Sequence, residues 1–258
     1  MKKLLRLLLV AAAAFVFLYQ QTNTLKTTRY TWQSGRVPAA FEGFRIVQIS
    51  DLHNKRFGKS QVRLLRAVRA AKPDMIALTG DIISRNTTNF EPTRELIEGL
   101  CGLAPLYYVD GNHDPVAPCY DEFLALLHRC GVAILDGPAR LERGGDAMTL
   151  AGYGYWDISI PTLAPADLVL YHNPDWFAQL AQAGCGLLLA GHIHGGQIAL
   201  PGGRAVLSPG LGFFPKYSAG VYREGEATMV LSRGLGTSVV PLRILAPPEI
   251  VVVTLESP

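Results

Sequence analysis

Short apolar runs that each end in a motif rich in Asp, His, Asn or Gly constrain the fold of this chain more than any other feature. These runs have the length and the turn-residue boundaries of buried strands. They cover residues 45–50, 74–79, 105–110, 167–171 and 186–190. Between them, residues 60–71, 92–103, 121–130 and 174–183 show helical spacing of apolar positions, with Ser60 as a candidate N-cap of the first helix. This alternation predicts parallel strands joined by helices.

The pattern changes near residue 132, after which short strands follow one another with few helices. Candidate strands cover residues 132–135, 140–143, 148–152, 205–208, 227–232 and 250–255, and Gly144-Gly145 is a candidate hairpin turn. We therefore expect an α/β fold in which a second, largely antiparallel sheet packs on the first.

Five of the six histidines lie in or beside the motifs that end the apolar runs, whereas His128 belongs to none. In open α/β sheets, ligands bind beyond the carboxyl ends of the strands, so these motifs are expected to meet at one rim. The motifs are Asp51-x-His53, Gly80-Asp81, Gly111-Asn112-His113-Asp114, His172 and Gly191-His192-x-His194.

Two carboxylates, several imidazoles and an amide are more donors than one ion needs, and they suit two ions that share a carboxylate. Oxygen and nitrogen donors without a thiolate fit Mn²⁺, Fe or Zn²⁺. Two such ions activate a bridging water and neutralise phosphoryl oxygens during an in-line displacement. The four cysteines show no C-x-x-C spacing, and we interpret them as small buried apolar residues.

The N-terminus carries the chain's only long apolar segment. Residues 7–19 are apolar and follow Lys2, Lys3 and Arg6, so residues 1–19 are expected to be a membrane anchor or signal segment. A helix over the 13 apolar residues would span about 20 Å, short of the roughly 30 Å hydrocarbon core. No small-x-small cleavage site follows, which favours an uncleaved signal-anchor over a cleaved signal or a peripheral segment. Residues 20–40 are expected to be a polar tether, and residues 41–258 to be the catalytic domain.

Charge is distributed unevenly along the chain. Residues 1–30 hold five cations and no acid, so the remainder carries −2 of the overall charge of +3. A slightly acidic body argues against a nucleic-acid partner, which needs a basic surface. The basic start favours a membrane surface and weakly favours a body outside the cytoplasm. No feature indicates an obligate protein partner.

Together the motifs resemble the full motif set of the calcineurin-like metallophosphoesterases, over about residues 42–256. Gly195-Gly196-Gln197, residues 232–237 (SRGLGT) and Pro248-Glu249-Ile250 resemble the membrane-anchored bacterial branch of that family. That branch includes phosphodiesterases and a UDP-2,3-diacylglucosamine pyrophosphohydrolase of lipid A synthesis. The resemblance implies a four-layer α/β/β/α sandwich of two mixed sheets.

The resemblance also implies a role for each motif residue and a need for two divalent metal ions. His113 would stabilise the phosphoryl group or protonate the leaving oxygen, and Asp114 would orient His113. One metal would be bound by Asp51, His53 and His194, the other by Asn112, His172 and His192, and Asp81 would bridge both.

The implied activity is that of a metal-dependent phosphoric ester hydrolase at a bacterial inner or plasma membrane, on a side that the sequence leaves open. The favoured substrate is an amphipathic diester or pyrophosphate such as UDP-2,3-diacylglucosamine. The alternatives are cell-envelope or phospholipid diesters, a nuclease, and a scaffold that only retains the fold. Lys55 and Arg56 are either a solvated pair or a phosphate contact. The aromatic loops at 153–164 and 212–217 either pack, line the substrate or touch the membrane.

Overall fold

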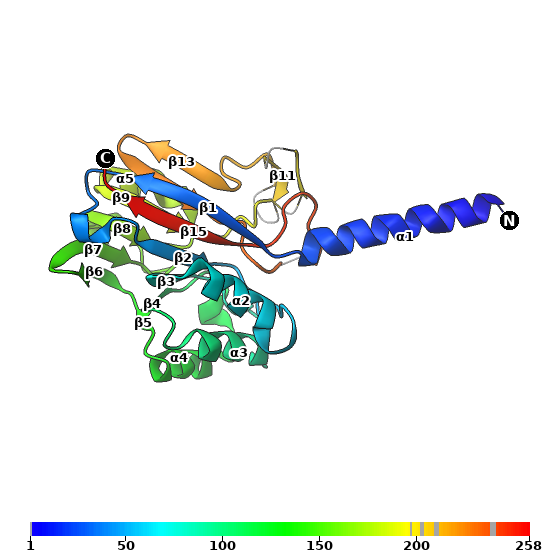
Figure 1. Cartoon of the computed structure of the whole chain (residues 1–258), viewed down its shortest axis with the longest axis horizontal. Helices are drawn as coiled ribbons and strands as arrows, with labels where there is room; N and C mark the ends of the chain where they lie inside the picture. The colour runs from blue at the N-terminus through cyan, green and yellow to red at the C-terminus, as the bar shows by residue number, and fades with distance from the viewer. Residues whose placement is uncertain (1, 197, 202–203, 209–211, 238–240) are drawn as a thin grey trace.

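Two six-stranded sheets form the body of the protein, with a long N-terminal helix and a small third sheet at one end (Figure 1). The computed structural model describes residues 2–196, 198–201, 204–208, 212–237 and 241–258. Met1 and Gln197, which belong to segments singled out in the sequence, lie outside the described residues.

The first sheet carries the motifs from the first half of the chain. Its strand order is β1 (Lys26–Gln33), β15 (Glu249–Glu256), β2 (Arg45–Ile49), β3 (Met75–Thr79), β4 (Leu106–Val109) and β5 (Ala133–Ile134). Strands β2 to β5 are mutually parallel, whereas β15 is antiparallel to β2 and parallel to β1. The outer face of this sheet packs on α2 (Val62–Ala71), α3 (Glu91–Leu100) and α4 (Tyr120–Arg129).

The second sheet carries the motifs from the second half. Its order is β13 (Gly220–Glu224), β14 (Ala227–Leu231), β9 (Cys185–Ala190), β8 (Ala166–Leu170), β7 (Asp146–Gly152) and β6 (Gly137–Arg143). Helix α5 (Phe177–Gln182) packs on its outer face. The third sheet joins β10 (Ile198–Ala199), β11 (Ala205–Ser208) and β12 (Gly212–Phe213). Short 3₁₀ turns cover Ala39–Phe41, Lys59–Gln61, Asp114–Val116, Ile160–Thr162 and Pro174–Trp176.

Three apolar cores separate four layers, which confirms the expected α/β/β/α sandwich. Alternate residues of β15 face opposite sides, because the side-chain period of a strand is two. Ile250 and Val252 lie in the core beneath α2 to α4, while Val251 and Val253 lie in the core between the two sheets. The third core lies between the second sheet and α5.

The expectation of a largely antiparallel second sheet is wrong. Its four central strands, β14, β9, β8 and β7, are parallel, and only the outer pairs β13–β14 and β6–β7 are antiparallel hairpins. The runs at 167–171 and 186–190, which were expected to share one rim with the first three runs, form the centre of the second sheet. The hairpin turn at Gly144-Gly145 is present, with φ of 57° and 91°.

The expected tether at residues 20–40 is partly regular structure. The N-terminal helix α1 (Lys2–Asn23) runs on past Tyr19, because the Gln residues that follow do not break a helix. Strand β1 then pairs along its whole length with β15 and buries Trp32, as alternating β-branched and aromatic residues favour.

The start of helix α2 also differs from the expected one. Ser60 is not its N-cap, because Ser60 has a φ of 51° and the helix begins only at Val62. The buried Gln61 side chain instead accepts a hydrogen bond from the Phe57 amide and donates one to the Lys55 carbonyl.

Candidate metal centre

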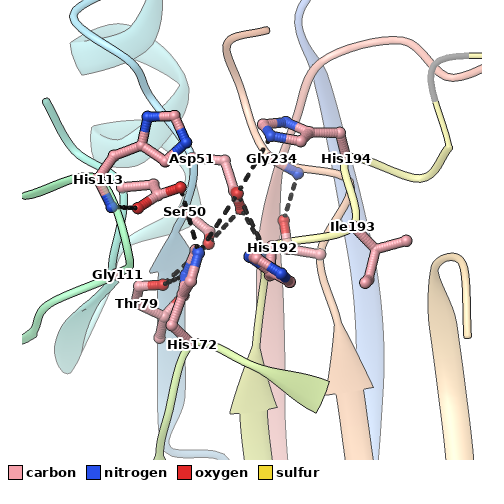
Figure 2. A network of polar contacts seen from close by, with 12 residues as sticks. Ser50, Asp51, Thr79, Gly111, His113, His172, His192, Ile193, His194 and Gly234 are labelled. Atoms are coloured by element: carbon pink, nitrogen blue, oxygen red, sulfur yellow. Dashed lines mark hydrogen bonds and ion pairs between the residues drawn. The ribbon is translucent and has the colours of Figure 1, made fainter. Parts of the chain in front are cut away.

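The motif residues meet where the carboxyl ends of strands from both sheets face one another (Figure 2). At the join, Gln48 of β2 donates hydrogen bonds of 2.9 Å to the Thr79 hydroxyl and to the Ala190 carbonyl of the second sheet. These bonds tie the two sheets together directly below the motifs. The sheets thus deliver their strand-end side chains to a shared, buried rim.

The backbone bends sharply to aim these side chains. Five motif residues adopt left-handed φ values, which are uncommon outside glycine and mark a strained, over-determined site. They are Asp51 (51°), His53 (49°), Asp81 (53°), His192 (78°) and His194 (55°).

Two glycines are required by close approach rather than by their backbone angles. A Cβ on Gly111 would collide with the Asp81 carboxylate, and a Cβ on Gly191 would collide with the Ser50 hydroxyl and the Asp51 carboxylate. Because Gly111 and Gly191 have no side chain, the backbone at Gly111 packs against the Asp81 carboxylate, and the backbone at Gly191 packs against the Asp51 carboxylate.

The donor atoms form three groups, each with all of its atoms within 4.8 Å of one another. The first group is Asp51, His53 and His194, and the second is Asp81, His172 and His192. The Asp81 carboxylate lies between them, with Oδ2 at 3.6 Å from Nε2 of His53 and 3.3 Å from Nε2 of His172. His53 and Asp81 also form a third group with His113. The structure thus brings together all the predicted His and Asp ligands.

The unpaired atoms of this cluster fit a bound cation. Nε2 of His53, Nε2 of His172 and Oδ1 of Asn112 are buried and have no hydrogen-bond partner among the described residues. His172 uses its other nitrogen, Nδ1, in a 2.7 Å hydrogen bond to the Thr79 carbonyl. Such a bond fixes the imidazole so that Nε2 presents its lone pair to a metal.

Further hydrogen bonds hold the carboxylates in place. The Ser50 hydroxyl donates to Asp51 Oδ2 at 2.6 Å, and the His192 amide donates to Asp51 Oδ1 at 3.0 Å. The His113 amide donates to Asp81 Oδ1 at 2.8 Å, which leaves Asp81 Oδ2 facing the imidazoles.

Asp114 does not orient the His113 ring as expected. The fully buried Asp114 carboxylate instead accepts the backbone amides of Asp81 (2.7 Å), Gly111 (2.8 Å) and Ile83 (2.9 Å). It therefore ties two ligand loops together. The His113 ring lies edge-on to His53 at 4.8 Å, and its Nδ1 and Nε2 each lie 3.4 Å from nitrogens of Arg85.

A family comparison agrees with this arrangement. A model described as calcineurin-like phosphoesterase matches residues 44–196, more than half of the chain. The chain belongs to the calcineurin-like phosphoesterase family.

Relatives of this phosphoesterase share most of its length. An uncharacterised metallophosphoesterase of Bacillus subtilis, YkuE, is 31% identical over 93% of this chain and 88% of its own. The phosphodiesterase YaeI of Escherichia coli is 31% identical over 82% of each chain. The UDP-2,3-diacylglucosamine pyrophosphatase LpxG of Chlamydia muridarum is 26% identical over 94% of this chain and 93% of its own. The chain is therefore a metal-dependent phosphoric ester hydrolase.

Electrostatics keep most of the phosphoesterase's imidazoles in the neutral, metal-binding form. Burial lowers the pKa of His53 to about 3 and that of His192 to about 4, and it holds the pKa of His194 well below its usual range. Burial also lowers the pKa of His172, but the adjacent Asp81 carboxylate outweighs it and raises that pKa to about 10.

The pKa values of the buried carboxyl groups shift in opposite directions. Burial raises the pKa of Asp51 to about 6 and, together with the nearby Asp81 charge, that of Asp114 to about 7. Burial acts on Asp81 in the same sense, but His172 and His53 lower its pKa well below the usual range. Asp81 is therefore the carboxylate that stays ionised between the two donor groups.

The structure adds two residues that the motifs do not contain. Tyr155 places its ring 6.0 Å from that of His172 and 5.6 Å from that of His192, and so forms one wall of the site. The fully buried Arg243 donates to the backbone carbonyl of His194 at 3.2 Å and lies 3.5 Å from its Nδ1. Tyr155 lies in the aromatic loop noted in the sequence, whereas no pattern marks Arg243.

The two cations considered as phosphate contacts lie elsewhere. Arg56 forms an ion pair of 3.2 Å with Glu95, and the Lys55 ammonium donates to the Thr22 carbonyl of α1. His128 lies exposed on α4, away from the donor groups. The exposed Arg85, beside His113, is better placed to meet a phosphate.

Proposed function

We propose that this phosphoesterase uses two divalent cations to hydrolyse a phosphodiester or pyrophosphate bond of an amphipathic substrate at a membrane. The observation that carries the proposal is the Asp81 carboxylate between the two donor groups. A shared carboxylate is expected where two ions lie about 3.5–4 Å apart. The donors are oxygen and nitrogen atoms only, which fits Mn²⁺, Fe or Zn²⁺.

In this proposal Asp51, His53 and His194 hold the first ion. Asn112, His172 and His192 hold the second, and Asp81 contacts both. The bound pair supplies an activated water and neutralises the oxygens of the phosphoryl group.

His113 is the residue proposed to assist the leaving group. Its ring lies next to His53 at the half-buried edge of the cluster, and the Arg85 guanidinium lies beside it. Burial lowers the pKa of His113, so a proton placed on it is readily given to a leaving oxygen. Arg85 adds positive charge where the phosphate arrives.

Membrane attachment is proposed through α1. This helix has 22 residues, none of them buried, and is apolar enough to cross a membrane. At 1.5 Å per residue its apolar residues 7–19 cover about 20 Å of the roughly 30 Å hydrocarbon core, and the long side chains of Lys3 and Arg6 can reach the headgroups at its outer end. Lys2, Lys3 and Arg6 at its start favour a cytoplasmic N-terminus and a catalytic body on the opposite side of a bacterial inner or plasma membrane.

Two relatives support different substrates. LpxG is named as a UDP-2,3-diacylglucosamine pyrophosphatase, which supports a nucleotide-linked lipid as the substrate. YaeI is named as a phosphodiesterase, and a body outside the cytoplasm favours cell-envelope or phospholipid diesters instead. Both substrates combine a phosphate bond with an apolar part that a membrane holds.

The experiment that tests the proposal uses the full chain loaded with Mn²⁺ in detergent, because β1 begins at Lys26 and a deeper truncation would remove part of the first sheet. Hydrolysis of bis-p-nitrophenyl phosphate, p-nitrophenyl phosphate and UDP-2,3-diacylglucosamine is measured in parallel. Release of UMP from the lipid nucleotide supports the pyrophosphatase assignment, and turnover of the artificial diester alone supports envelope diesters.

An Asp81→Asn variant is expected to lose activity at least about 100-fold, because loss of a shared ligand should cost no less than the 10- to 100-fold lost when a residue that supports a ligand is changed. Asp121→Asn is the matched control, because Asp121 lies exposed on α4. Equal activity of the Asp81 variant and the control, or no hydrolysis of any ester by the native protein, contradicts the proposal.

A further inference from the structure

The inner end of α1 docks directly on the loops that carry the metal donors. The Lys55 ammonium donates to the Thr22 carbonyl at 2.5 Å, and the Arg63 guanidinium donates to the Asn23 carbonyl at 2.9 Å. Both cations satisfy carbonyls that the end of a helix leaves unpaired. Because Lys55 follows His53 by two residues, the helix end is fixed beside the first donor group.

A second loop joins α1 to the same group. The amide of Arg243, whose side chain contacts His194, donates to the Thr22 hydroxyl at 3.2 Å. The Leu245 amide donates to the Gln21 side chain, also at 3.2 Å. Two loops that reach the donor group Asp51, His53 and His194 are therefore hydrogen-bonded to the last turn of α1. We call the contacts of Lys55, Arg63, Arg243 and Leu245 with α1 the latch.

This latch sets the distance between the metal centre and a membrane that α1 would enter. The apolar part of α1 ends at Tyr19, and Asn23 lies four residues further on. At 1.5 Å per residue this gap is about 6 Å, close to the thickness of one headgroup layer. The surface around the latch would therefore meet lipid headgroups.

An exposed apolar patch adjoins the latch. We define the apolar patch as Ile198, Leu200, Phe213, Phe214 and Leu245, which are between 36% and 74% exposed. It is continuous with the latch, because Ile198 bridges to Ile244 and the Ala199 amide donates to the Ile244 carbonyl at 2.9 Å. The β11 region lies at the same end of the body as the base of α1 (Figure 1).

The third sheet presents this patch as a surface. Ile198 and Phe213 both pair with Leu207, so the three side chains share one face of the sheet. Phe213 is 74% exposed and Phe214 57% exposed. Adjacent exposed phenyl rings are unfavourable in water and are typical of a surface that contacts a partner or a membrane.

Cations flank the apolar patch. The Arg204 guanidinium lies 5.9 Å from the centre of the Phe214 ring, and the Lys216 ammonium lies 4.6 Å from that of Tyr217. Phenylalanine beside Lys or Arg is the composition of surfaces that lie in the interface of an anionic membrane.

We infer that the β10–β12 sheet is a second membrane contact, which places Phe213 and Phe214 in the leaflet that α1 enters. The inference rests on the proposed anchoring by α1. The apolar patch then lies in the headgroup layer of a bilayer that contains anionic lipids. The loops that carry the first donor group are bonded to the end of α1, so the metal centre is held beside that layer and would take phosphate esters from the membrane rather than from bulk solution.

The test measures how deeply single side chains lie in the bilayer. The full chain is reconstituted in vesicles of phosphatidylcholine and phosphatidylglycerol, with and without brominated lipids that quench nearby tryptophan. Phe15→Trp reports on α1, and Phe213→Trp and Phe214→Trp report on the apolar patch. Ile134→Trp on β5 is the matched control, because Ile134 is also exposed but lies on the far edge strand of the first sheet. The native protein gives the signal of its own three tryptophans for subtraction.

The inference predicts loss of the added fluorescence in brominated vesicles for the variants at Phe15 and at Phe213 or Phe214, and none for the control at Ile134. Quenching at Phe15 without quenching at either Phe213 or Phe214 overturns the second contact and leaves the anchoring intact. Absence of quenching at Phe15 overturns the anchoring itself. Unchanged hydrolysis of bis-p-nitrophenyl phosphate in detergent shows that each variant is folded.

Discussion

At the scale of single residues, the site is built on backbone positions that few side chains tolerate. The left-handed angles at Asp51, Asp81 and His192 turn the ligands inward at the ends of their strands. Gly111 and Gly191 let a second backbone approach to within contact of those ligands. Small changes at these positions are therefore expected to displace the Asp81 or Asp51 carboxylate and so to weaken metal binding.

Substitution of Gly111 tests this directly. In Gly111→Ala the new Cβ meets both the carboxylate and the backbone nitrogen of Asp81, so the carboxylate and its loop must move. We expect metal affinity and kcat/KM to fall by about 10- to 100-fold, as for other changes that disturb ligand positions. Gly35→Ala is the control, because a Cβ at Gly35 has open space around it. Equal metal affinity of the two variants, measured by titration calorimetry, contradicts this role of Gly111.

The pKa of His172 predicts a pH dependence of metal binding. Because the Asp81 carboxylate raises that pKa to about 10, His172 is protonated at pH 7.5 in the metal-free protein and must release its proton to bind a metal. Metal affinity is therefore expected to rise about tenfold per pH unit between pH 7 and 9. The raised pKa of His172 also stabilises the metal-free fold, because the folded protein holds the His172 proton more tightly than the unfolded chain does. This stabilisation is complete below pH 6.5 and is lost as the pH rises through about 10.

Calorimetric titrations in buffers of different ionisation enthalpy measure this proton. The prediction is about one proton released per protein near pH 7.5. No proton release, together with a metal affinity that does not change with pH, shows that His172 is already neutral.

At the scale of elements, the strands at the centre of each sheet could be predicted from the sequence because their apolar runs end at turn residues. β2, β3, β4, β8 and β9 lie within two residues of the expected runs. The partners of these strands could not be predicted, because the apolar run of β8 would suit either sheet. Strand β1 was missed because it is polar on its exposed face and lies outside the motifs.

Arg243 shows how a segment without regular structure is held in place. Its guanidinium donates to the carbonyls of Gly236, His194, Ala246 and Arg233, and its amide contacts α1. Burial lowers its pKa only to about 10, so it remains charged. A single arginine that joins distant carbonyls leaves no periodic signal in the sequence.

Removal of this side chain is expected to destabilise the protein. Arg243→Ala leaves several buried carbonyls without a donor, and the free energy of unfolding should fall by about 3 kcal/mol. Arg69→Ala, at an exposed position on α2, should change it by less than about 0.5 kcal/mol. Urea unfolding of both variants measures the difference. Equal midpoints contradict a stabilising role for the Arg243 side chain.

At the scale of the whole molecule, α1 leaves the body at one end (Figure 1), and the candidate metal centre lies beside this helix end, because Lys55, two residues after His53, donates to the Thr22 carbonyl. The clustering of the candidate ligands could be predicted because each follows a strand, and strand ends share one rim. The surroundings of the site, such as Tyr155, Arg85 and the latch on α1, arise from contacts between distant segments. Those contacts depend on how the two sheets are stacked, which no local pattern specifies.

The measurement that tests the two-metal site most directly is anomalous diffraction from crystals of the Mn²⁺-loaded protein. Two peaks about 3.5–4 Å apart are predicted, one on each side of the Asp81 carboxylate. One peak should contact Asp51, His53 and His194, and the other His172, His192 and Asn112. A single peak, or two peaks that do not both contact Asp81, would contradict the shared-carboxylate site.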